Sequence, residues 1–574
     1  MWAPVAERVD LVLDTGPEAM RRTSGGWWQA ERELPAGARY RFALDRGEPL
    51  ADPRALRLPN GPAGPAEVVD LAALPWNDHD WRGVRLHGSI IYELHVGTFT
   101  AEGTLDSAIE RLDHLVDLGV SLVELMPLAS FPGRDGWGYD GVGLWAVHEP
   151  YGGPAALARF VDGCHARGLG VCLDVVYNHL GPSGNRLPDF GPYFTDQYQT
   201  PWGQAVNLDG PGSDEVRRFI IDNALLWLRD LHVDALRLDA VHALHDERAL
   251  PLLEQLSTEV DALAEQLRRP LWLIAESDRN DPRTVTPRDQ GGLGIHAQWA
   301  DDVHHGLHAA LTGETQGYYA EFAEPGALAK VLGGVFWHDG TWSAFRGRTH
   351  GRPIDRSRVP GWRFVVSLQT HDQVGNRATG DRLSATLDAG TLACGAALLL
   401  TGPGTPMLFM GEEWGAYTPW QYFTDHPDPE LAEAVRHGRR REFGSHGWAA
   451  AEIPDPQDPA TVARSRLDWA EPGGQPHARL LDWYRELITL RRERADLADP
   501  HLDMVAIQHD PVARTVVLHR GAHRVAVNVS DETVELDVGL TGLAAVAAFD
   551  REATDVNGQL VRLPCRSAAV LGPR

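Results

Sequence analysis

Eight short apolar runs recur between Ile90 and about Met410, and segments with helical periodicity separate most of them. Gly or polar residues bound each run, a pattern typical of strands buried in a parallel sheet. We therefore predict an α/β fold built on a TIM (β/α)8 barrel. The predicted strands are Ile90–Val96, Leu122–Met126, Val171–Val176, Ala235–Leu238, Leu271–Ala275, a weak one at Ala297–Ala300, Phe364–Leu368 and Pro406–Phe409.

A chain of 574 residues exceeds what one hydrophobic core usually supports, so further domains are expected. Residues 1–85 alternate apolar and polar positions in short pieces, as in Val9–Leu13 and Tyr40–Leu44. This alternation predicts an N-terminal β-sandwich. We expect the catalytic barrel over residues 86–495, and the short strands that follow predict a C-terminal β-sandwich over 496–574.

Helices and loops of the barrel are also visible in the pattern. Helical periodicity predicts helices at Leu105–Leu118, Ala155–Arg167, Asp214–Leu231, Leu250–Leu267 and His477–Arg494. Two loop insertions are expected, at about 180–212 and 303–360, and long loops of this kind usually act as lids or binding walls.

The charge balance limits the partners of the chain. It has 53 basic and 80 acidic residues, a net charge of −27, which would be repelled by nucleic acid and by anionic membranes. The most apolar stretch, Leu392–Met410, is interrupted by Gly and Pro, and a helix followed by a strand explains it better than a membrane span. We expect neither nucleic acid nor a membrane as a partner.

The four cysteines are Cys164, Cys172, Cys394 and Cys565, and no pair has zinc-ligand spacing. Reduced, buried thiols are the simplest prediction. The amino terminus lacks a basic stretch followed by an apolar one, so no signal peptide is expected and the predicted location is cytoplasmic.

Three carboxylates each follow a predicted strand: Asp239, Glu276 and Asp372. Barrel strands present catalytic side chains at their carboxyl ends, so these groups should meet at one rim. Two carboxyl groups that face each other are the minimum equipment for breaking a glycosidic bond. The sequence therefore predicts a sugar-cleaving barrel enzyme.

The neighbours of these carboxylates indicate their roles. Arg237 lies two residues before Asp239, so both side chains point to the same side, and the guanidinium favours the ionised form that a nucleophile needs. A buried Arg–Asp pair that only holds the barrel together is the alternative. Glu276, in a partly dry pocket near another carboxylate, should have a raised pKa and act as general acid and then base. Asp372 is expected to grip sugar hydroxyls and to help Glu276 stay protonated.

Other residue types support the same site. His179 and His371 end strands and are expected to donate to sugar hydroxyls, although a lone strand-end His is more often structural. Of 19 tryptophans, Trp137 and Trp299 are expected nearest the substrate. A metal site is disfavoured because no His pair has helical i, i+4 spacing with a Glu.

Four ordered segments resemble the signature regions of the α-amylase superfamily of retaining α-glycosidases. They are Asp174–His179, Leu236–Asp239, Ile274–Glu276 and Thr370–Asp372. The resemblance implies that Asp239 is the nucleophile, Glu276 the acid/base and Asp372 the transition-state stabiliser. It also implies that the sugar ring on the non-reducing side of the cleaved bond is bound by Tyr139, His179, Arg237 and His371.

Further segments resemble the branch of this superfamily that releases trehalose from maltooligosyltrehalose. They are Tyr92–Phe99, Glu276–Asp281, Gln298–His305 and His371–Arg382. This resemblance implies cleavage of the α-1,4 bond next to the terminal trehalose, with maltooligosyltrehalose or another α-glucan as substrate. It adds these candidate substrate-binding residues: His242 on the leaving-group side, Asp278, Asp301, Asp302, His304, Gln373 and Asn376.

The resemblance also sets expectations outside the substrate site. It implies an N-terminal sandwich like that of glycogen branching enzymes, which we expect to lack its first strand because the chain begins Met1-Trp-Ala-Pro. Asn178 is present, but the other ligands of the calcium site of secreted α-amylases are not evident. No cofactor and no metal are expected.

Three alternatives stay open. A glycogen branching or debranching enzyme of the same superfamily would differ in its products. A catalytically silent α-glucan-binding protein would hydrolyse nothing, and a metal-dependent barrel enzyme would lose activity on chelation.

Overall fold

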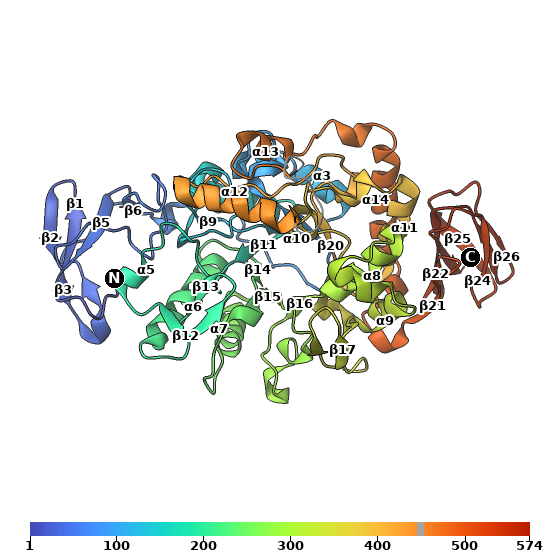
Figure 1. Cartoon of the computed structure of the whole chain (residues 1–574), viewed down its shortest axis with the longest axis horizontal. Helices are drawn as coiled ribbons and strands as arrows, with labels where there is room; N and C mark the ends of the chain where they lie inside the picture. The colour runs from blue at the N-terminus through green and yellow to red at the C-terminus, as the bar shows by residue number, and fades with distance from the viewer. Residues whose placement is uncertain (445–452, 574) are drawn as a thin grey trace.

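The eight predicted runs form one closed barrel of parallel strands, in the order β7-β8-β11-β14-β15-β16-β19-β20. The computed structural model describes residues 1–444 and 453–573 and places this barrel between sheets at the two ends of an elongated molecule (Figure 1). The strands are β7 Ile91–Leu94, β8 Leu122–Leu125, β11 Gly170–Val175, β14 Ala235–Leu238, β15 Trp272–Ala275, β16 Ala297–Trp299, β19 Phe364–Ser367 and β20 Thr405–Phe409. The predicted barrel is confirmed.

The barrel interior is layered, because side chains two residues apart on a strand point to the same side. One layer is apolar and contains Ile91, Leu122, Cys172 and Ala235, which belong to one buried hydrophobic cluster. Two residues further along the same strands lies a charged layer, at most 2% exposed, formed by Glu93, Glu124, Asp174 and Arg237. The strand register pairs Glu93 with Glu124 and Asp174 with Arg237. Buried charges therefore lie directly beneath the carboxyl rim.

Helices cover the outside of the barrel much as the periodicity predicts. They include α4 Gly153–His165, α6 Ser213–Arg229, α7 Leu252–Leu267, α8 Asp301–Thr312, α11 Ala389–Thr401 and α14 His477–Glu493.

The single helix predicted at Leu105–Leu118 is wrong, since α2 Leu105–Ile109 and α3 Leu112–Leu118 are separate. Arg111 is the residue directly before α3, at φ −104° and ψ −1°, and its guanidinium lies 4.6 Å from the Trp469 ring. A tertiary contact accompanies the break, and neither Gly nor Pro marks it in the sequence.

The two predicted insertions carry secondary structure of their own. Residues 180–212 contain α5 Leu187–Phe190 and an antiparallel pair, β12 Phe194–Thr200 with β13 Gly203–Val206. The second insertion begins inside α8 and continues through α9 Ala327–Gly334 to another antiparallel pair, β17 Thr341–Ser343 with β18 Arg348–His350.

The N-terminal sheets include both predicted strands. A four-stranded sheet has the order β2-β1-β5-β6, and β3 pairs with β4 separately. Their bounds are β1 Val9–Leu13, β2 Gly16–Ala19, β3 Arg21–Arg22, β4 Trp28–Gln29, β5 Arg39–Leu44 and β6 Ala66–Glu67. Arg57 joins this region to the barrel, because its Nε and Nη2 donate to Glu149 at 3.0 and 2.5 Å.

The C-terminal region consists of a five-stranded sheet, β21-β22-β23-β28-β25, and a three-stranded sheet, β24-β27-β26. The strands are β21 Ala506–Asp510, β22 Thr515–Arg520, β23 His523–Asn528, β24 Val534–Asp537, β25 Leu543–Ala548, β26 Asp555–Asn557, β27 Leu560–Leu563 and β28 Ser567–Pro573. Helix α11 packs against β23 and β28 and so links this region to the barrel.

The predicted helix-then-strand at Leu392–Met410 is confirmed as α11 followed by β20. Among the described residues, no helix combines the length and apolarity needed to cross a membrane. The prediction that all four thiols are buried is wrong for one of them. Cys164, Cys172 and Cys394 are buried, whereas Cys565 is exposed because it lies in the turn between β27 and β28.

Candidate active site

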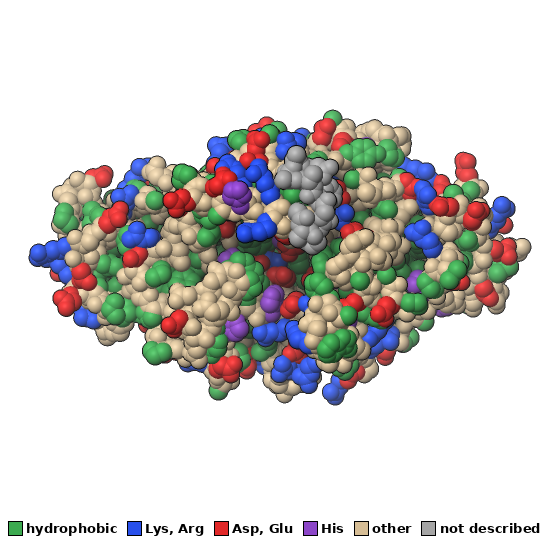
Figure 2. Space-filling model, in the orientation of Figure 1, with side chains coloured by type: hydrophobic (Ala, Val, Ile, Leu, Met, Phe, Trp, Pro, Cys, Tyr) green, Lys and Arg blue, Asp and Glu red, His purple; other side chains and the backbone are tan. Residues whose placement is uncertain are grey.

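The three predicted carboxylates meet at one rim of the barrel. Asp239 directly follows β14, Glu276 directly follows β15, and Asp372 is the second residue of α10 His371–Gly375, shortly after β19. The charges of Asp239 and Asp372 both act on the carboxyl of Glu276, so all three face a common space. Figure 2 shows a hollow near the centre of this face, with acidic and histidine side chains in and around it.

Arg237 joins two of these carboxyl groups. Its Nη1 lies 2.7 Å from Oδ1 of Asp239, and its Nη2 lies 3.1 Å from Oε2 of Glu276. The guanidinium is itself fully buried and also contacts both oxygens of Asp174 at 2.9 Å. Because one rigid guanidinium contacts both groups, Asp239 and Glu276 are close neighbours.

Asn178 holds Asp239 from the other side. Its Nδ2 donates to Oδ2 of Asp239 at 2.6 Å and to the Asp239 backbone oxygen at 2.8 Å. Asn178 is fully buried, just past the end of β11. Sequence reasoning considered this residue only as part of a calcium site, although its place after a barrel strand was a usable signal.

The backbone after Asp239 is shaped to reach Glu276. Ala240 has φ 37° and ψ 51°, a left-handed conformation that is uncommon for a residue other than Gly. In this conformation its N–H donates to Oε2 of Glu276 at 2.6 Å. The strained turn therefore sets the position of the Glu276 carboxyl.

The environment of Glu276 changes its proton affinity. Burial raises the pKa of Glu276 to about 8, and the charges of Asp239, Asp372 and Asp301 act in the same direction against the opposing effect of Arg237. The side chain is nevertheless 18% exposed, so it can reach a ligand at this rim. A carboxyl group of this kind holds a proton at neutral pH.

Asp372 is the most open of the three, with a side chain that is 40% exposed. Thr370 caps the start of α10 by accepting the Asp372 N–H at 3.2 Å, and Asn376 donates to Oδ1 of Asp372 at 3.2 Å. Burial and the charge of Asp372 raise the pKa of Asp301, at the start of α8, to about 7. Asp301 is therefore a fourth acidic group at this rim.

His371 and Tyr139 form a buried pair beside the carboxylates. Nδ1 of His371 donates to Glu93 at 2.5 Å, and its Nε2 lies 2.8 Å from the Tyr139 hydroxyl, which donates to Asp174 at 2.7 Å. Burial alone would lower the pKa of His371, but the charges of Glu93 and Asp372 raise it to about 9. Glu93 was not predicted as a site residue, because a glutamate inside an apolar run has no distinctive local pattern.

The predicted sugar donor His179 has protein partners at both ring nitrogens. Its Nδ1 contacts Oδ1 of Asn178, and its Nε2 lies 3.1 Å from the Tyr139 backbone oxygen. The ring stacks on Trp202 at 4.6 Å, and Trp202 is 47% exposed in the turn between β12 and β13. The open aromatic face near His179 thus belongs to Trp202, which sequence reasoning missed.

Trp137 and Trp299, the two predicted substrate aromatics, are 7% and 4% exposed. Trp137 stacks on Trp420 at 4.4 Å, and Trp299 lies under the Arg237 guanidinium at 4.4 Å. Both therefore support the site from beneath and offer little open ring surface to a ligand.

The predicted residues His242 and Asp278 lie close to each other and close to an arginine that was not predicted. Asp278 lies 3.3 Å from Nη1 of Arg346 and 4.0 Å from Nδ1 of His242. Burial lowers the pKa of His242. Arg346 comes from the connection between β17 and β18, so the second insertion reaches this side of the site.

Three other predicted residues have different surroundings: Asp302 binds neighbouring protein groups, and His304 and Gln373 line a different cavity. Oδ2 of Asp302 accepts from Asn280 at 2.8 Å and from two backbone N–H groups of the segment 337–338 at 2.7 and 3.2 Å. His304 is 1% exposed, and together with Gln373 it lines a separate cavity of about 190 Å³. The lining of this cavity includes none of Asp239, Glu276 and Asp372.

The donor set fits carbohydrate chemistry better than metal binding. Within residues 1–443 and 453–573, no group of three or more His, Cys, Asp or Glu side chains is placed to hold a metal ion. Two neighbouring carboxyl groups, one bound to a guanidinium and an amide and the other carrying a proton, can cleave a glycosidic bond by acid and nucleophilic catalysis.

Comparisons with known proteins agree with this chemistry. A family model of the alpha-amylase catalytic domain matches residues 76–188. The malto-oligosyltrehalose trehalohydrolase of Arthrobacter ramosus is 58% identical over 533 residues, which cover 91% of this chain and 92% of the relative. The protein of the same name from Rhizobium sp. (strain M-11) is 53% identical over 580 residues, covering 100% and 97%.

Solved structures extend the likeness to the whole architecture. A crystal structure of a Salmonella typhimurium protein matches with a TM-score of 0.91 and 36% identity, and the match covers 100% of this chain and 97% of that one. The similarity thus includes both terminal sheet regions as well as the barrel, a fold that many unrelated enzymes share. The chain is a glycoside hydrolase of the α-amylase type and belongs to the malto-oligosyltrehalose trehalohydrolase family.

Proposed function

We propose that this enzyme cleaves the α-1,4-glucosidic bond adjacent to the terminal trehalose of maltooligosyltrehalose, releasing trehalose and a maltooligosaccharide. The observation that carries the chemistry is the contact of one buried guanidinium with the carboxyl groups of both Asp239 and Glu276. Retaining enzymes need their two carboxyl groups only about 5–5.5 Å apart, whereas inverting enzymes leave room for a water between them. Close neighbours on one guanidinium support retention. The substrate itself is inferred from the family.

In the first step, Glu276 protonates the bridging glycosidic oxygen while Asp239 attacks the anomeric carbon. The carbon–oxygen bond to the leaving group breaks, trehalose departs, and a covalent glycosyl-enzyme forms. Arg237 and Asn178, which contact Asp239, hold the attacking carboxylate in place. The raised pKa of Glu276, about 8, keeps a proton available for this step at neutral pH.

In the second step, the now ionised Glu276 removes a proton from a water molecule that attacks the anomeric carbon. The bond to Asp239 breaks, and the maltooligosaccharide leaves with its α configuration restored after two inversions. We assign Asp372 to the sugar hydroxyls and to the charge of the transition state, because its carboxylate is the most exposed of the three. Tyr139, Arg237 and His371 complete the pocket around the reacting ring.

The alternatives differ in measurable ways. A branching or debranching enzyme is disfavoured because the full-length relatives share the trehalohydrolase name. A silent glucan-binding protein would have no need for a protonated Glu276 beside Asp239. A metal-dependent activity would be lost on chelation, whereas we expect EDTA to leave turnover unchanged.

Product analysis tests the proposal. Purified enzyme is incubated with maltooligosyltrehalose and, in parallel, with the maltooligosaccharide of equal length, and the products are separated by chromatography. We expect free trehalose and one shorter maltooligosaccharide from the first substrate, with much slower cleavage of the second. Transfer products without new reducing ends would support a branching enzyme instead.

The nucleophile is tested by Asp239→Asn, which keeps the size and shape of the side chain. We expect turnover to fall by roughly three orders of magnitude or more, because no covalent intermediate can form. Circular dichroism and the thermal midpoint should show an intact fold. Asp289→Asn, at an exposed carboxylate outside the site, is the matched control. If the Asp239→Asn enzyme retained a tenth of the wild-type activity, the assignment of Asp239 as the nucleophile would be contradicted.

We infer a cytoplasmic location from the cysteines. All four are free, and a reducing compartment keeps thiols in that state. Fractionation of the native cells with an antibody against the chain should place it with cytoplasmic markers; recovery in the medium would refute this.

A further inference from the structure

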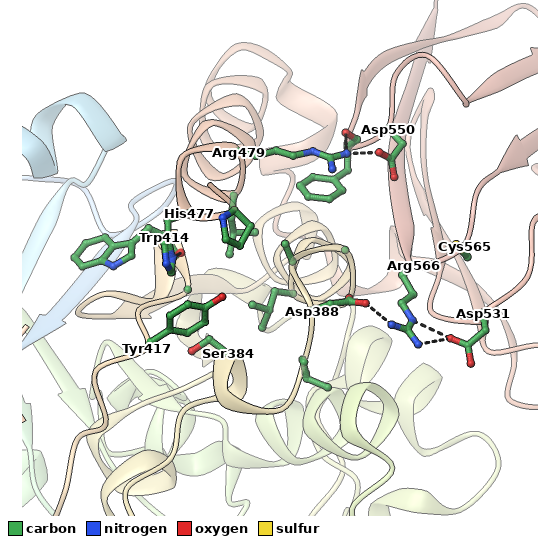
Figure 3. Close-up of a pocket in the computed structure, with 18 residues that line it drawn as sticks. Ser384, Asp388, Trp414, Tyr417, His477, Arg479, Asp531, Asp550, Cys565 and Arg566 are labelled. Atoms are coloured by element: carbon green, nitrogen blue, oxygen red, sulfur yellow. Dashed lines mark hydrogen bonds and ion pairs between the residues drawn. The ribbon is translucent and has the colours of Figure 1, made fainter. Parts of the chain in front are cut away.

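A second cavity lies between the barrel and the C-terminal sheets. It measures about 690 Å³, and none of its lining residues belongs to the carboxylate cluster (Figure 3). The barrel side contributes residues 384–392 before and within α11, residues 414–417 after β20, and the start of α14. The C-terminal side contributes Asp531, Phe549, Asp550, Cys565 and Arg566. The volume is within the range of about 300–1,000 Å³ that small-molecule sites occupy.

The cavity has an apolar floor and one aromatic wall. Trp414 and Leu480 are at most 1% exposed, whereas Tyr417 is 57% exposed. The Tyr417 ring packs edge-on against His477 at 4.6 Å, and Nδ1 of His477 is bound to the Trp414 backbone oxygen at 2.8 Å. Tyr417 is therefore an open ring held at a set angle. Such rings pack well against the C–H face of a pyranose, because they supply apolar area at little cost in side-chain entropy.

Two ion-pair groups line the rim. Arg566 contacts Asp388 of the barrel side and Asp531, the latter at 2.5 Å. Arg479 of α14 contacts Asp550 and donates to the Phe549 backbone oxygen at 2.9 Å. Figure 3 shows both groups opposite Tyr417 and Trp414. Each guanidinium is already neutralised by a carboxylate, so among the described residues that line the cavity there is no unpaired cation to attract an anion.

Hydrogen-bonding capacity remains at this rim. Asp531 uses only Oδ1 towards Arg566, and Asp550 uses only Oδ1 towards Arg479. Within the part of the chain that the structure describes, no hydrogen bond reaches Oδ2 of either residue. Free carboxylate acceptors beside an aromatic wall and an apolar floor suit a neutral ligand with many hydroxyl groups. The net charge of −27 also disfavours an anionic ligand.

We propose that this cavity is a second binding site for a short neutral gluco-oligosaccharide, separate from the site of hydrolysis. The polyhydroxylated class follows from the lining, and the gluco-oligosaccharide identity rests on the proposed function. Because the lining comes from both sides, a bound sugar contacts the barrel and the C-terminal sheet together. Tyr417 supplies the stacking face, and Asp531 and Asp550 accept hydroxyl protons.

Cys565 provides a local reporter, since it lines the cavity and is the exposed cysteine among the four. In the full-length Asp239→Asn enzyme, which leaves sugars intact, we measure alkylation of Cys565 by iodoacetamide with mass spectrometry. Maltotriose and trehalose should slow this alkylation in a saturable way, and calorimetry with maltotriose should detect two classes of site. Inorganic phosphate should give no protection.

Variants locate the effect. Tyr417→Ala should weaken protection by roughly three- to tenfold, in line with the loss of one aromatic contact, while Tyr417→Phe should retain it. Asp531→Asn should weaken protection as well, and Glu535→Gln, at an exposed carboxylate on β24 outside the cavity, should not. Unchanged alkylation at saturating sugar, equal protection in Tyr417→Ala, or protection by phosphate would each overturn the proposal.

The test separates this site from the hydrolytic one. Tyr417→Ala in the wild-type background should still release trehalose from maltooligosyltrehalose at a normal rate. Cavity protection without any hydrolysis by the wild-type enzyme would refute the proposed function and leave the second site standing. Hydrolysis by the wild-type enzyme without protection of Cys565 would refute the second site and leave the proposed function standing.

Discussion

Arg237 shows at the residue scale how one buried cation organises several acids. It contacts Asp174, Asp239 and Glu276, and its flat face lies 4.4 Å from the Trp299 ring. A buried cation is stable only when its charge is compensated, and here the carboxylates of Asp174 and Asp239 supply that compensation. Replacement of Arg237 would leave these acids buried together, so its structural and catalytic effects cannot be separated by simple deletion.

The pH dependence of catalysis follows from Glu276. The general acid must be protonated to donate, so activity is present below its pKa and lost above it. We expect kcat/KM to fall by about tenfold per pH unit once the pH exceeds about 8. Stopped assays across this range, with the fold monitored by circular dichroism at each pH, measure the effect. A flat profile well above pH 8 would contradict the role of Glu276.

Glu124 offers a stability test outside the chemistry. It is 1% exposed, and burial together with the charges of Glu93 and Asp174 raises its pKa from 4.5 to about 8. Between these two values the folded chain keeps a proton that the unfolded chain releases. This group therefore makes the free energy of unfolding fall as the pH rises through the window.

Glu124→Gln removes this titration. Relative to the wild type, the free energy of unfolding of the variant should rise with pH, by more than about 1 kcal/mol between pH 5 and pH 8. Denaturant unfolding at several pH values measures the difference, with Glu535→Gln as the exposed control. A difference that does not change with pH would refute the raised pKa.

At the scale of elements, α8 anchors the second insertion through Asp302. One carboxylate oxygen accepts the side-chain amide of Asn280 and the backbone N–H groups of Trp337 and His338. Asn280 and His338 are buried, Trp337 is half-buried, and all three donors would lose their partner together. The loop that brings Arg346 to Asp278 begins just beyond this anchor.

Asp302→Ala should therefore lower the free energy of unfolding by roughly 2–4 kcal/mol and speed amide exchange at residues 337–338. Hydrogen exchange with mass spectrometry reads the segment directly. Asp339→Ala, which removes a half-exposed partner of Lys330 in the same loop, should cost less than about 1 kcal/mol. Equal effects of the two variants would show that Asp302 is no anchor.

At the scale of the whole molecule, packing within the barrel and between the barrel and the C-terminal sheets buries three of the four thiols. Cys394 lies in α11, which packs against β23 and β28, and its thiol donates to the Asn528 backbone oxygen at 3.4 Å. Cys164 and Cys172 are covered by the barrel and its helices.

Ellman's reagent tests this arrangement. In the native enzyme one thiol, Cys565, should react quickly, and all four should react after denaturation. A Cys565→Ser variant should show no fast phase. A second fast thiol in the native state would mean that the packing of the C-terminal sheet against the barrel opens readily.

Much of this architecture was predictable because the signals are local. All eight barrel strands were located within a residue or two, since each is a short apolar run between polar boundaries. Asp239, Glu276 and Asp372 follow such runs and were therefore identifiable. In contrast, no Gly or Pro marks the break between α2 and α3, and the contact that Arg111 makes there is with the distant Trp469.

Site residues were missed where their role depends on a partner far away in the sequence. Glu93 is buried against His371 but looks ordinary inside an apolar run, and the contact of Asn178 with Asp239 joins residues 61 positions apart. Trp202 and Arg346 reach the site only because the two insertions fold back over the rim. Three predicted residues lie in segments that resemble the trehalose-releasing branch but have other surroundings. Asp302 binds Asn280 and the backbone of residues 337–338, whereas His304 and Gln373 line another cavity.

The amino-acid sequence alone determined the barrel and the rim at which its three carboxylates lie. Apolar runs and the polar residues that end them are properties of neighbouring residues. The tertiary structure decided which acid carries the proton and which residues surround it. Those outcomes depend on burial and on charges from several strands, and such distances exist only once the chain is folded.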